Sequence, residues 1–274
     1  MSGGGQRRGD GGERRPTSSV RDFYDSLAPD HHRIFPDWDA SMTRQAAAPD
    51  SLISRRLGPG PHRLLDCSCG IGTQAIGLAR AGHRVVGGDL SPVAAARAAA
   101  EAAARDIGLP TVAADMCQLP FGAGRFDVVV AADNSIAHLL TEPDLRAALR
   151  AMRRVLRDGG LLLLTLRDYA ELRRTRPEST APRVSYDSTG RSITFQLWHW
   201  HDDGEHYDQE HFQLVPDGDG WQVRVRRAAS WALSLEQVGE AAAEAGFTGL
   251  VLHAPDTSGF YQPVLTGRRS VGPA

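Results

Sequence analysis

The feature that most constrains the fold is a short apolar run that ends in a glycine-bearing turn. Residues 64–65 are leucines that lead to Asp66, and Gly70 and Gly72 follow before a stretch that favours a helix. A second apolar run then ends at Asp89. Strand, glycine turn, helix and strand form a parallel unit whose carboxyl edge suits an adenosine-containing ligand. The glycines let the backbone approach the ligand, and the acid after the second strand accepts hydrogen bonds from a ribose diol.

The turn differs from the dinucleotide fingerprint Gly-x-Gly-x-x-Gly, because Ala75 stands where the third glycine would be. Asp66 would also repel a pyrophosphate placed at the helix N-terminus, whereas it suits a cationic or amino-acid ligand. An ordinary glycine turn in an α/β fold is the alternative. The pattern Asp-x-x-x-Gly-x-Gly, with an acid after the next strand, resembles the class I S-adenosylmethionine-dependent methyltransferases.

Further strand signals predict the rest of the sheet. Candidate strands at residues 111–114, 126–132 and 161–166 alternate with helical patterns, which is typical of a doubly wound parallel α/β sheet. The resemblance implies a seven-stranded, Rossmann-like sheet that finishes with a helix and an antiparallel pair. Residues 249–253 and 259–266 are the candidates for that pair.

The composition divides the chain into four parts. Residues 1–19 hold almost no apolar side chain, which predicts a disordered tail. Residues 20–57 are expected to form an N-terminal helical lid, broken into short helices by Pro29, Pro36 and Pro49. The remaining expected parts are the cofactor-binding domain at residues 58–169 and 230–267, and a small antiparallel β insertion over the acceptor site at residues 170–229.

Composition also excludes several classes of function. The chain has 274 residues and a formal net charge of −2, so no electrostatic footprint for nucleic acid or membrane is visible. No apolar stretch reaches the roughly 18 residues of a membrane span, and no signal-peptide pattern opens the sequence, which predicts a cytoplasmic protein. Three cysteines cannot build a disulfide framework. Lysine is absent, which excludes a pyridoxal Schiff base and a P-loop.

Two short segments narrow the predicted function. Residues 134–139 read Asn-Ser-x-Ala-His-Leu after the fourth strand, and residues 159–169 read Gly-Gly-Leu-Leu…Arg-x-Tyr around the fifth. Both resemble glycine N-methyltransferase and its bacterial glycine/sarcosine relatives. The general resemblance covers residues 20–267, but these discriminating motifs are short. It implies methyl transfer to a small molecule, most simply the amine of an amino acid or a similar carboxylate-bearing amine.

The resemblance implies a role for each matching position. Arg167 would pair with the carboxylate of the acceptor, and a planar guanidinium fork suits that geometry. Asn134 would help to hold the acceptor, Arg44 would bind the methionine carboxylate of S-adenosylmethionine, Tyr24 would lie near the sulfonium and His138 would border the cofactor. The expected cofactor-binding residues are Tyr24, Arg44, Asp66, Cys67, Gly70, Gly72, Asp89, Leu90, Asp115, Met116, Asp133 and His138. The expected catalytic residues are Tyr24, Asn134, Arg167 and His138, and the expected product is S-adenosylhomocysteine.

Departures from the family pattern keep the acceptor open. Residues 30–33 read Asp-His-His-Arg where the family lid has further aromatic side chains, Asp168 replaces an asparagine, and the hairpin over the site differs. An O- or N-methyltransferase that tailors a larger natural product is therefore the alternative. A larger, apolar pocket under Trp198, Trp200 and Trp221 would support it. A non-catalytic protein that only binds the cofactor is the second alternative.

Methyl transfer from a sulfonium needs little acid–base catalysis, because in-line transfer mainly requires that the two reactants are held at attack distance. An amine acceptor must be neutral, and burial beside a sulfonium lowers its pKa. Tyrosine oxygens or backbone carbonyls around the methyl group could stabilise the transition state. A phenol or acid acceptor would need a base, for which His31, His32 and His138 are candidates.

The hairpin at residues 199–211 carries four histidines and several acids. His199 and His201 share a strand face, so a facing histidine could complete a metal site. The alternative to this metal site is a polar hairpin over the mouth of the active site. Cys67 and Cys69 could also be considered as a metal-binding pair, but the alternative for them is packing at a strand end. We predict no metal. The expected partner is a small-molecule acceptor, without nucleic acid or membrane, and a homo-oligomer is left open.

Overall fold

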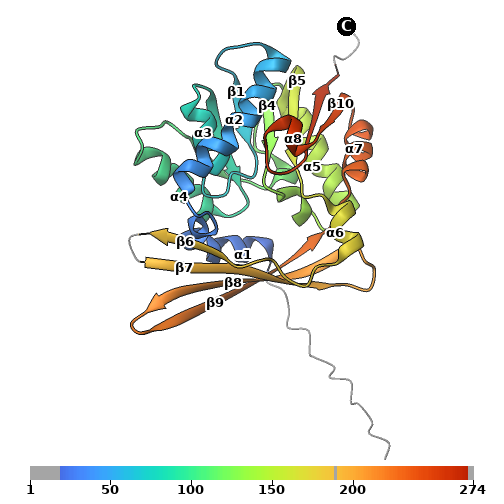
Figure 1. Ribbon diagram of the computed structural model, residues 1–274. Coiled ribbons are helices and arrows are strands. Elements are labelled where there is room, and N and C mark those ends of the chain that lie inside the picture. Colours follow the sequence, from blue (N-terminus) through green and yellow to red (C-terminus); the bar gives the residue numbers. More distant parts are fainter. Residues whose placement is uncertain (1–18, 188–189, 271–274) are drawn as a thin grey trace, which may run out of the picture.

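The computed structural model describes residues 19–187 and 190–270, which form a seven-stranded and a four-stranded sheet (Figure 1). The predicted tail at residues 1–19 lies outside the described residues except for Ser19. The hydroxyl of Ser19 accepts a hydrogen bond from the backbone of Asp22 and so caps the first helix. No helix in the described part of the chain is long and apolar enough to cross a membrane.

The larger sheet has the predicted doubly wound architecture. Its strands are β1 (Arg63–Asp66), β2 (Arg84–Asp89), β3 (Thr111–Ala113), β4 (Phe126–Ala131), β5 (Leu156–Thr165), β10 (Phe247–His253) and β11 (Val264–Arg269). They lie in the order β10-β11-β5-β4-β1-β2-β3. β1 to β5 are parallel, and β11 is antiparallel to β5 and to β10. The order reverses at β1, so a crevice opens at the carboxyl ends of β1 and β4, where ligands of such sheets bind.

Helices cover both faces of this sheet (Figure 1). The helices of the described residues are α1 (Val20–Leu27), η1 (Ala28–Ile34), α2 (Trp38–Leu57), α3 (Thr73–Arg80), α4 (Pro92–Ala103), η2 (Met116–Gln118), η3 (Ser135–His138), α5 (Glu142–Val155), α6 (Tyr169–Thr175), α7 (Leu235–Glu244) and α8 (Pro255–Ser258). Ser91, Thr141 and Ser234 cap α4, α5 and α7 with their side chains, as their sequence patterns predict.

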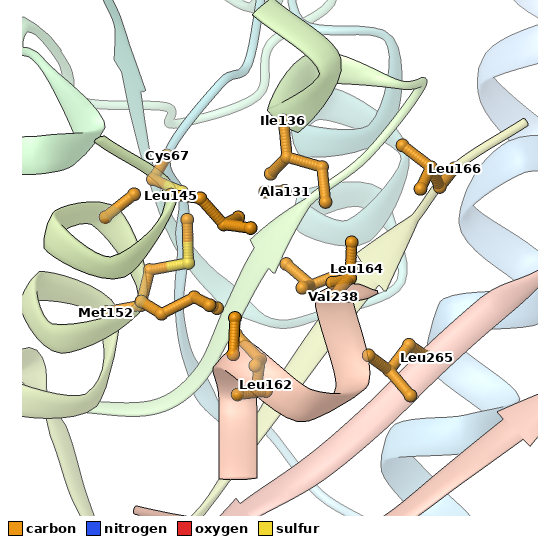
Figure 2. Close-up of a cluster of buried hydrophobic side chains, with 14 of the residues drawn as sticks. Cys67, Ala131, Ile136, Leu145, Met152, Leu162, Leu164, Leu166, Val238 and Leu265 are labelled. Atoms are coloured by element: carbon orange, nitrogen blue, oxygen red, sulfur yellow. The ribbon is translucent and has the colours of Figure 1, made fainter. Parts of the chain in front are cut away.

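The main core lies between β4, β5, α5 and α7 (Figure 2). Leu162 and Leu164 of β5 are at most 1% exposed, and they share this core with Leu145 and Met152 of α5. β5 is buried on both faces because α2 lies on its other side. Each such leucine contributes about 1.5–3 kcal/mol on burial, so the strand ends that carry polar side chains are rigidly placed.

Two expectations about where helices and strands begin and end are wrong. Pro49 does not end a helix, because α2 runs through it and buries Ala46, Leu52 and Ile53 against the core. This burial outweighs the roughly 3 kcal/mol that an interior proline costs. The fifth strand, expected at residues 161–166, begins earlier, at Leu156. The glycines after Asp158 lie in a register shift within this strand.

The second sheet is antiparallel and larger than expected. It consists of β6 (Arg183–Asp187), β7 (Gly190–Trp200), β8 (His206–Asp217) and β9 (Gly220–Trp231), in that order. The hairpin expected at residues 199–211 is present between β7 and β8, with Asp203 and Gly204 in its turn. Neither β6 nor α6 was expected, because residues 170–187 are mostly polar and show no clear period.

The lid, formed by α1 and η1, lies between the two sheets (Figure 1). Asp30 of η1 is 6% exposed, and its carboxylate accepts hydrogen bonds from Arg224 and Arg226 of β9. Burial raises the pKa of Asp30, but these arginines outweigh burial and hold that pKa below its ordinary value. On the opposite side, Ser91 at the start of α4 donates a hydrogen bond to Asp25 of α1. The lid is therefore attached to both halves of the molecule.

Candidate active site

A cavity of about 310 Å³ opens at the carboxyl ends of β1, β2 and β4. It brings together most of the predicted cofactor residues: Tyr24, Cys67, Gly70, Asp89, Leu90, Asp115, Met116, Asp133 and His138. Asp66 and Gly72 belong to the same loop but do not line the cavity. Arg44 lies elsewhere, on the wall of a second cavity, where its guanidinium donates a hydrogen bond to Ser41 at 3.0 Å.

The glycine loop and Asp89 hold each other in place. One carboxylate oxygen of Asp89 accepts the backbone N–H of Gly70 at 2.7 Å, and the other accepts that of Ser91 at 2.9 Å. Gly72 has φ +98°, and a Cβ there would lie 2.8 Å from the Cδ1 atom of Ile76. Only glycine fits that position, so the turn that begins α3 is fixed by sterics.

Asp66 is a buried carboxyl with spare acceptor capacity. It is 1% exposed, and one oxygen accepts the N–H of Ser68 at 3.3 Å. The other oxygen is buried without a hydrogen-bond partner among the described residues. Burial is the main cause that raises the pKa of Asp66 to about 7, and the charge of Asp89 adds to it. Such a site favours a cationic ligand.

The walls of this cavity suit a ligand with an apolar ring and polar ends. Leu90 follows Asp89 and is 41% exposed, which is high for a leucine beside a cavity. Asp115 is exposed at the end of β3 and accepts the N–H of Cys117. The half-buried Met116 lies beside it. Ribose, adenine and amino-acid groups of the predicted cofactor would thus each find matching side chains.

A larger cavity of about 870 Å³ adjoins the first, between the lid, the carboxyl edge of the large sheet and the inner face of the four-stranded sheet. Four residues line both cavities: Tyr24, His31, Asp133 and His138. A ligand in each cavity would therefore meet its neighbour at these four side chains. Of the predicted acceptor residues, Asn134 and Arg167 line the larger cavity alone.

Tyr24 and His138 form a hydrogen-bonded pair at this junction. The Nδ1 atom of His138 lies 3.1 Å from the carbonyl of Ala229, and a carbonyl only accepts, so Nδ1 carries the proton. The Nε2 atom lies 2.9 Å from the hydroxyl of Tyr24 and therefore accepts a hydrogen bond from it. Burial lowers the pKa of His138 to about 4 and raises the pKa of Tyr24, so both stay neutral. The hydroxyl proton of Tyr24 points to His138, which leaves its oxygen lone pairs for the junction.

Arg167 brings a positive charge to the larger cavity. Its guanidinium lies over the ring of Trp198, 5.0 Å from the ring centroid, and Trp198 stacks on the buried Tyr207. The Nη1 atom is buried and has no hydrogen-bond partner, and no carboxylate of the described residues pairs with Arg167. A cation held on an aromatic ring without an ion-pair partner is a ready site for an acidic ligand group.

Asn134 fixes the surroundings of Arg167. Its backbone is left-handed, with φ +68°, a conformation that asparagine tolerates. The side-chain oxygen accepts the backbone N–H of Arg167 at 3.1 Å, and the amide nitrogen donates to the hydroxyl of Tyr169 at 2.8 Å. Tyr169 in turn shares a hydrogen bond with Tyr207. The structure thus shows Asn134 positioning the arginine from the wall of the cavity.

Sequence reasoning offered a polar hairpin over the active site as one interpretation but did not identify which residues of the four-stranded sheet line it. Thr194, Gln196, Gln209 and His211 line the larger cavity from β7 and β8. The signal was the alternation of residues along these strands, which places Gln209 and His211 on one face. The apolar pocket under three tryptophans that would have supported a larger acceptor is not found: the larger cavity is not lined by Trp198, Trp200 or Trp221, and Trp221 is 40% exposed.

The histidines of the hairpin point in different directions. His199 pairs with Glu210, His206 pairs with Asp203, and His211 faces the cavity. Among residues 19–187 and 190–270, no group of three potential ligands is placed to hold a metal ion.

Comparisons with known proteins agree with this geometry. Residues 64–160 match a family model described as a methyltransferase domain. Glycine/sarcosine N-methyltransferase of Parasynechococcus marenigrum (strain WH8102) is 38% identical over 137 residues, which are 50% of this chain and 48% of that relative. The chain thus aligns with about half the length of this curated relative.

Solved structures match over nearly the whole chain. The CcbJ methyltransferase from Streptomyces caelestis has a TM-score of 0.71 at 18% identity and covers 94% of this chain and 100% of its own. The sugar N-methyltransferase KedS8 from Streptoalloteichus sp ATCC 53650 has a TM-score of 0.68 at 23% identity and covers 99% of both chains. These likenesses show the fold. Residues 64–160 thus match a methyltransferase domain, and the chain has the fold of the class I methyltransferases, whose methyl donor is S-adenosylmethionine.

Proposed function

We propose that the protein transfers a methyl group from S-adenosylmethionine to the amine of a small molecule that also carries a carboxylate. The observation that carries this proposal is Arg167, whose guanidinium is exposed to the larger cavity without an anionic partner among the described residues. A carboxylate of the acceptor would supply the missing bidentate partner. The similarity to a glycine/sarcosine N-methyltransferase supports an amine as the methyl acceptor.

The residues present fit the methyl donor. S-adenosylmethionine supplies an electrophilic methyl group on a sulfonium. Asp89 would accept the ribose hydroxyls, and the charge of Asp66, which is buried beside the lining residue Cys67, would attract an ammonium. The neutral Tyr24, oriented by His138, would present oxygen lone pairs where positive charge is spread in the transition state.

Two neutral histidines would hold the acceptor amine. The Nδ1 atom of His31 and the Nε2 atom of His211 are buried on the cavity wall without hydrogen-bond partners among the described residues. Burial is the main cause that lowers the pKa of His31 to about 3 and of His211 to about 4, so both remain neutral near pH 7. Such nitrogens accept N–H or O–H bonds without adding positive charge beside a sulfonium.

The size of the larger cavity favours a second candidate, a bulkier acceptor such as an amino sugar or another natural product. At roughly 30 Å³ for each water-sized group, the five heavy atoms of glycine would fill about 150 Å³. The cavity holds about 870 Å³. The polar wall of glutamines and histidine suits hydroxyl groups, and the fold resembles that of a sugar N-methyltransferase.

A panel of acceptors separates these candidates. We would measure S-adenosylhomocysteine release with glycine, sarcosine, dimethylglycine, larger amino acids and amino sugars. Turnover on amines with a carboxylate is the expected result. Turnover on amino sugars alone would replace the first candidate with the second. No S-adenosylhomocysteine release with any acceptor of the panel, while the protein still binds the cofactor, would contradict the amino-acid proposal.

Asp66 predicts how binding of S-adenosylhomocysteine depends on pH. The ligand's ammonium is attracted by the ionised carboxyl of Asp66. This form predominates only when the pH is above the pKa of about 7. We expect affinity, measured by calorimetry, to fall up to about tenfold for each pH unit below pH 7 and to level off above it. Asp66→Asn should give weaker binding with a flat profile. A parent profile that is flat from about pH 5.5 to 8 would show that Asp66 does not bind the ammonium.

A further inference from the structure

One carboxylate lies at the junction of the two cavities. Four side chains line both cavities, and three of them, Tyr24, His31 and His138, are neutral near pH 7. Burial is the main cause in each case: it lowers the pKa of His31 to about 3 and of His138 to about 4, and it raises the pKa of Tyr24. The fourth side chain is Asp133. Among these four, Asp133 thus brings the negative charge to the place where the methyl donor and the acceptor would meet.

Asp133 is held in place, but one of its carboxylate oxygens is available. Its backbone N–H donates a hydrogen bond to the buried hydroxyl of Thr165 at 2.7 Å. The hydroxyl of Tyr261 donates a hydrogen bond to the Oδ1 atom of Asp133. Within residues 19–187 and 190–270, the Oδ2 atom of Asp133 receives no hydrogen bond, and its carboxylate forms no ion pair. Oδ2 can therefore accept a hydrogen bond from a ligand.

Arg167 places the opposite charge at the end of the neighbouring strand. β4 and β5 pair in parallel, and Asp133 and Arg167 each follow the end of their strand by two residues. Paired strands lie about 4.8 Å apart, so both residues border the same part of the larger cavity. The guanidinium of Arg167 lies on the ring of Trp198, whereas Asp133 bonds to Tyr261. The two charges are thus not joined to each other, and together they suit a molecule with an ammonium and a carboxylate.

We propose that Asp133 binds the ammonium of the acceptor and takes its proton, which makes Asp133 the catalytic base. This inference rests on the proposed function, because it requires an amine as the methyl acceptor. Amines are mostly protonated at neutral pH, and an ammonium has no lone pair to attack a methyl group. Proton transfer to a carboxylate leaves two neutral groups, which a partly desolvated site favours. Transfer to His31 or His211 would only move a positive charge within the cavity, beside the sulfonium.

The proposed step balances without a further reactant. One N–H bond of the ammonium breaks, its proton forms an O–H bond with Asp133, and the electron pair stays on nitrogen. This pair forms the bond to the methyl carbon while the carbon–sulfur electron pair moves to sulfur. The sulfonium thereby becomes a neutral thioether, and the methylated nitrogen carries the positive charge. Asp133 then returns its proton to water in the larger cavity, which restores the carboxylate.

The charged and titratable groups that surround Asp133 keep one form near neutral pH. Tyr24 approaches from the lid, Arg167 from the end of β5 and Tyr261 from the loop before β11. Burial and then the charge of Asp133 raise the pKa of both tyrosines, so they stay protonated. Arginine stays charged, and the two histidines of the junction stay neutral. A change of rate between about pH 6 and about pH 8 would therefore not come from these groups.

The pH profile of kcat/KM for the acceptor tests the role of Asp133. We would use the amine of the panel with the fastest turnover and saturate the donor, so that the titration of Asp66 has no effect. If Asp133 takes the proton, the ammonium is the reacting form, and kcat/KM of the parent should stay constant from about pH 6 to about pH 8. In Asp133→Asn the proton must first go to water. We expect its kcat/KM to rise about tenfold per pH unit and to lie on the order of a hundredfold below the parent at pH 7.

Asp168→Asn is the matched control. Asp168 is an exposed acid on the wall of the same cavity, and an asparagine can still cap α6. This variant should keep the flat profile. A second measurement needs no turnover: calorimetry of the same amine added to the complex with S-adenosylhomocysteine. Asp133→Asn should weaken this binding about tenfold to a hundredfold, because a charge-assisted hydrogen bond is lost, and Asp168→Asn should not change it.

The outcomes separate this inference from the proposed function. Turnover of an amine with a parent profile that already rises tenfold per pH unit, or with a flat profile in folded Asp133→Asn, overturns the role of Asp133 and leaves the proposed function standing. No turnover with any amine overturns the proposed function, and this inference with it. Asparagine tolerates the left-handed backbone at position 133, where φ is +56°, and thermal unfolding shows whether the variant is folded. If it is not, the profile of the parent alone still decides.

Discussion

Replacing Asp89 with alanine is expected to weaken S-adenosylhomocysteine binding at least a hundredfold. The carboxylate would lose its hydrogen bonds with the ribose, each worth about 1.5–3 kcal/mol for a charged acceptor. The same change leaves the N–H groups of Gly70 and Ser91 without their acceptor, so the glycine loop loses its anchor. Calorimetric titration with the purified variant measures the loss directly.

Asp89→Asn and Asp219→Ala are the matched controls for this experiment. The asparagine keeps the size of the side chain and one accepting oxygen, so its binding should lie between that of the parent and that of the alanine variant. Asp219 is exposed in the turn between β8 and β9, and its removal should change nothing. Parent-like affinity in a folded Asp89→Ala variant would show that the ribose is bound elsewhere and that the cofactor assignment of this cavity is wrong.

Arg167→Ala is expected to raise the KM for the acceptor by about two orders of magnitude while S-adenosylhomocysteine affinity stays unchanged. Losing a charge-assisted, bidentate pair in a buried site costs roughly 3 kcal/mol, which corresponds to about a hundredfold in binding. Arg167 lines the larger cavity and not the smaller one, so the donor should not sense the change. Steady-state kinetics with the best acceptor of the panel give both constants.

Arg183→Ala provides the comparison, because Arg183 is an exposed arginine that also lines the larger cavity. A solvated charge contributes little, so this variant should change KM only a few-fold. Equal effects of the two substitutions would indicate a general electrostatic influence. An unchanged KM in Arg167→Ala would remove the carboxylate from the proposed acceptor and favour the bulkier, neutral alternative.

The site residues that the sequence predicted best are those set by local structure. Gly70, Asp89 and Asp115 each lie at or shortly after the carboxyl end of a parallel strand, so the order of strand, turn and helix brings them to one cavity. Arg44 depends instead on how a long helix packs against the sheet. That helix continues through Pro49, contrary to expectation, and Arg44 lies on the wall of the larger cavity.

The acceptor wall could not be predicted because it depends on contacts between distant segments. Gln209 and His211 read as part of a polar hairpin, and the same alternation fits either face of a sheet. Which face turns inward is decided by the lid, where Asp30 meets β9. The aromatic support of Arg167 was missed for the same reason, since Trp198 and Tyr207 come together only when β7 and β8 pair.

The ion pairs of Asp30 with Arg224 and Arg226 determine which side of the lid opens when ligands enter or leave. Pulling this carboxylate away from Arg224 and Arg226 would strand a buried charge, at a cost of roughly 3–5 kcal/mol. On the other side of the lid, Ser91 donates a hydrogen bond to Asp25, and Arg97 of α4 donates hydrogen bonds to Ala28 and His32. Breaking these contacts strands no charge, because Arg97 keeps its ion pair with Glu101. We therefore expect the lid to travel with the four-stranded sheet as one body and to part from α4. The backbone N–H of Ser91 also bonds to Asp89, so that movement opens the smaller, cofactor cavity first. S-adenosylhomocysteine can then leave while the larger cavity keeps its shape.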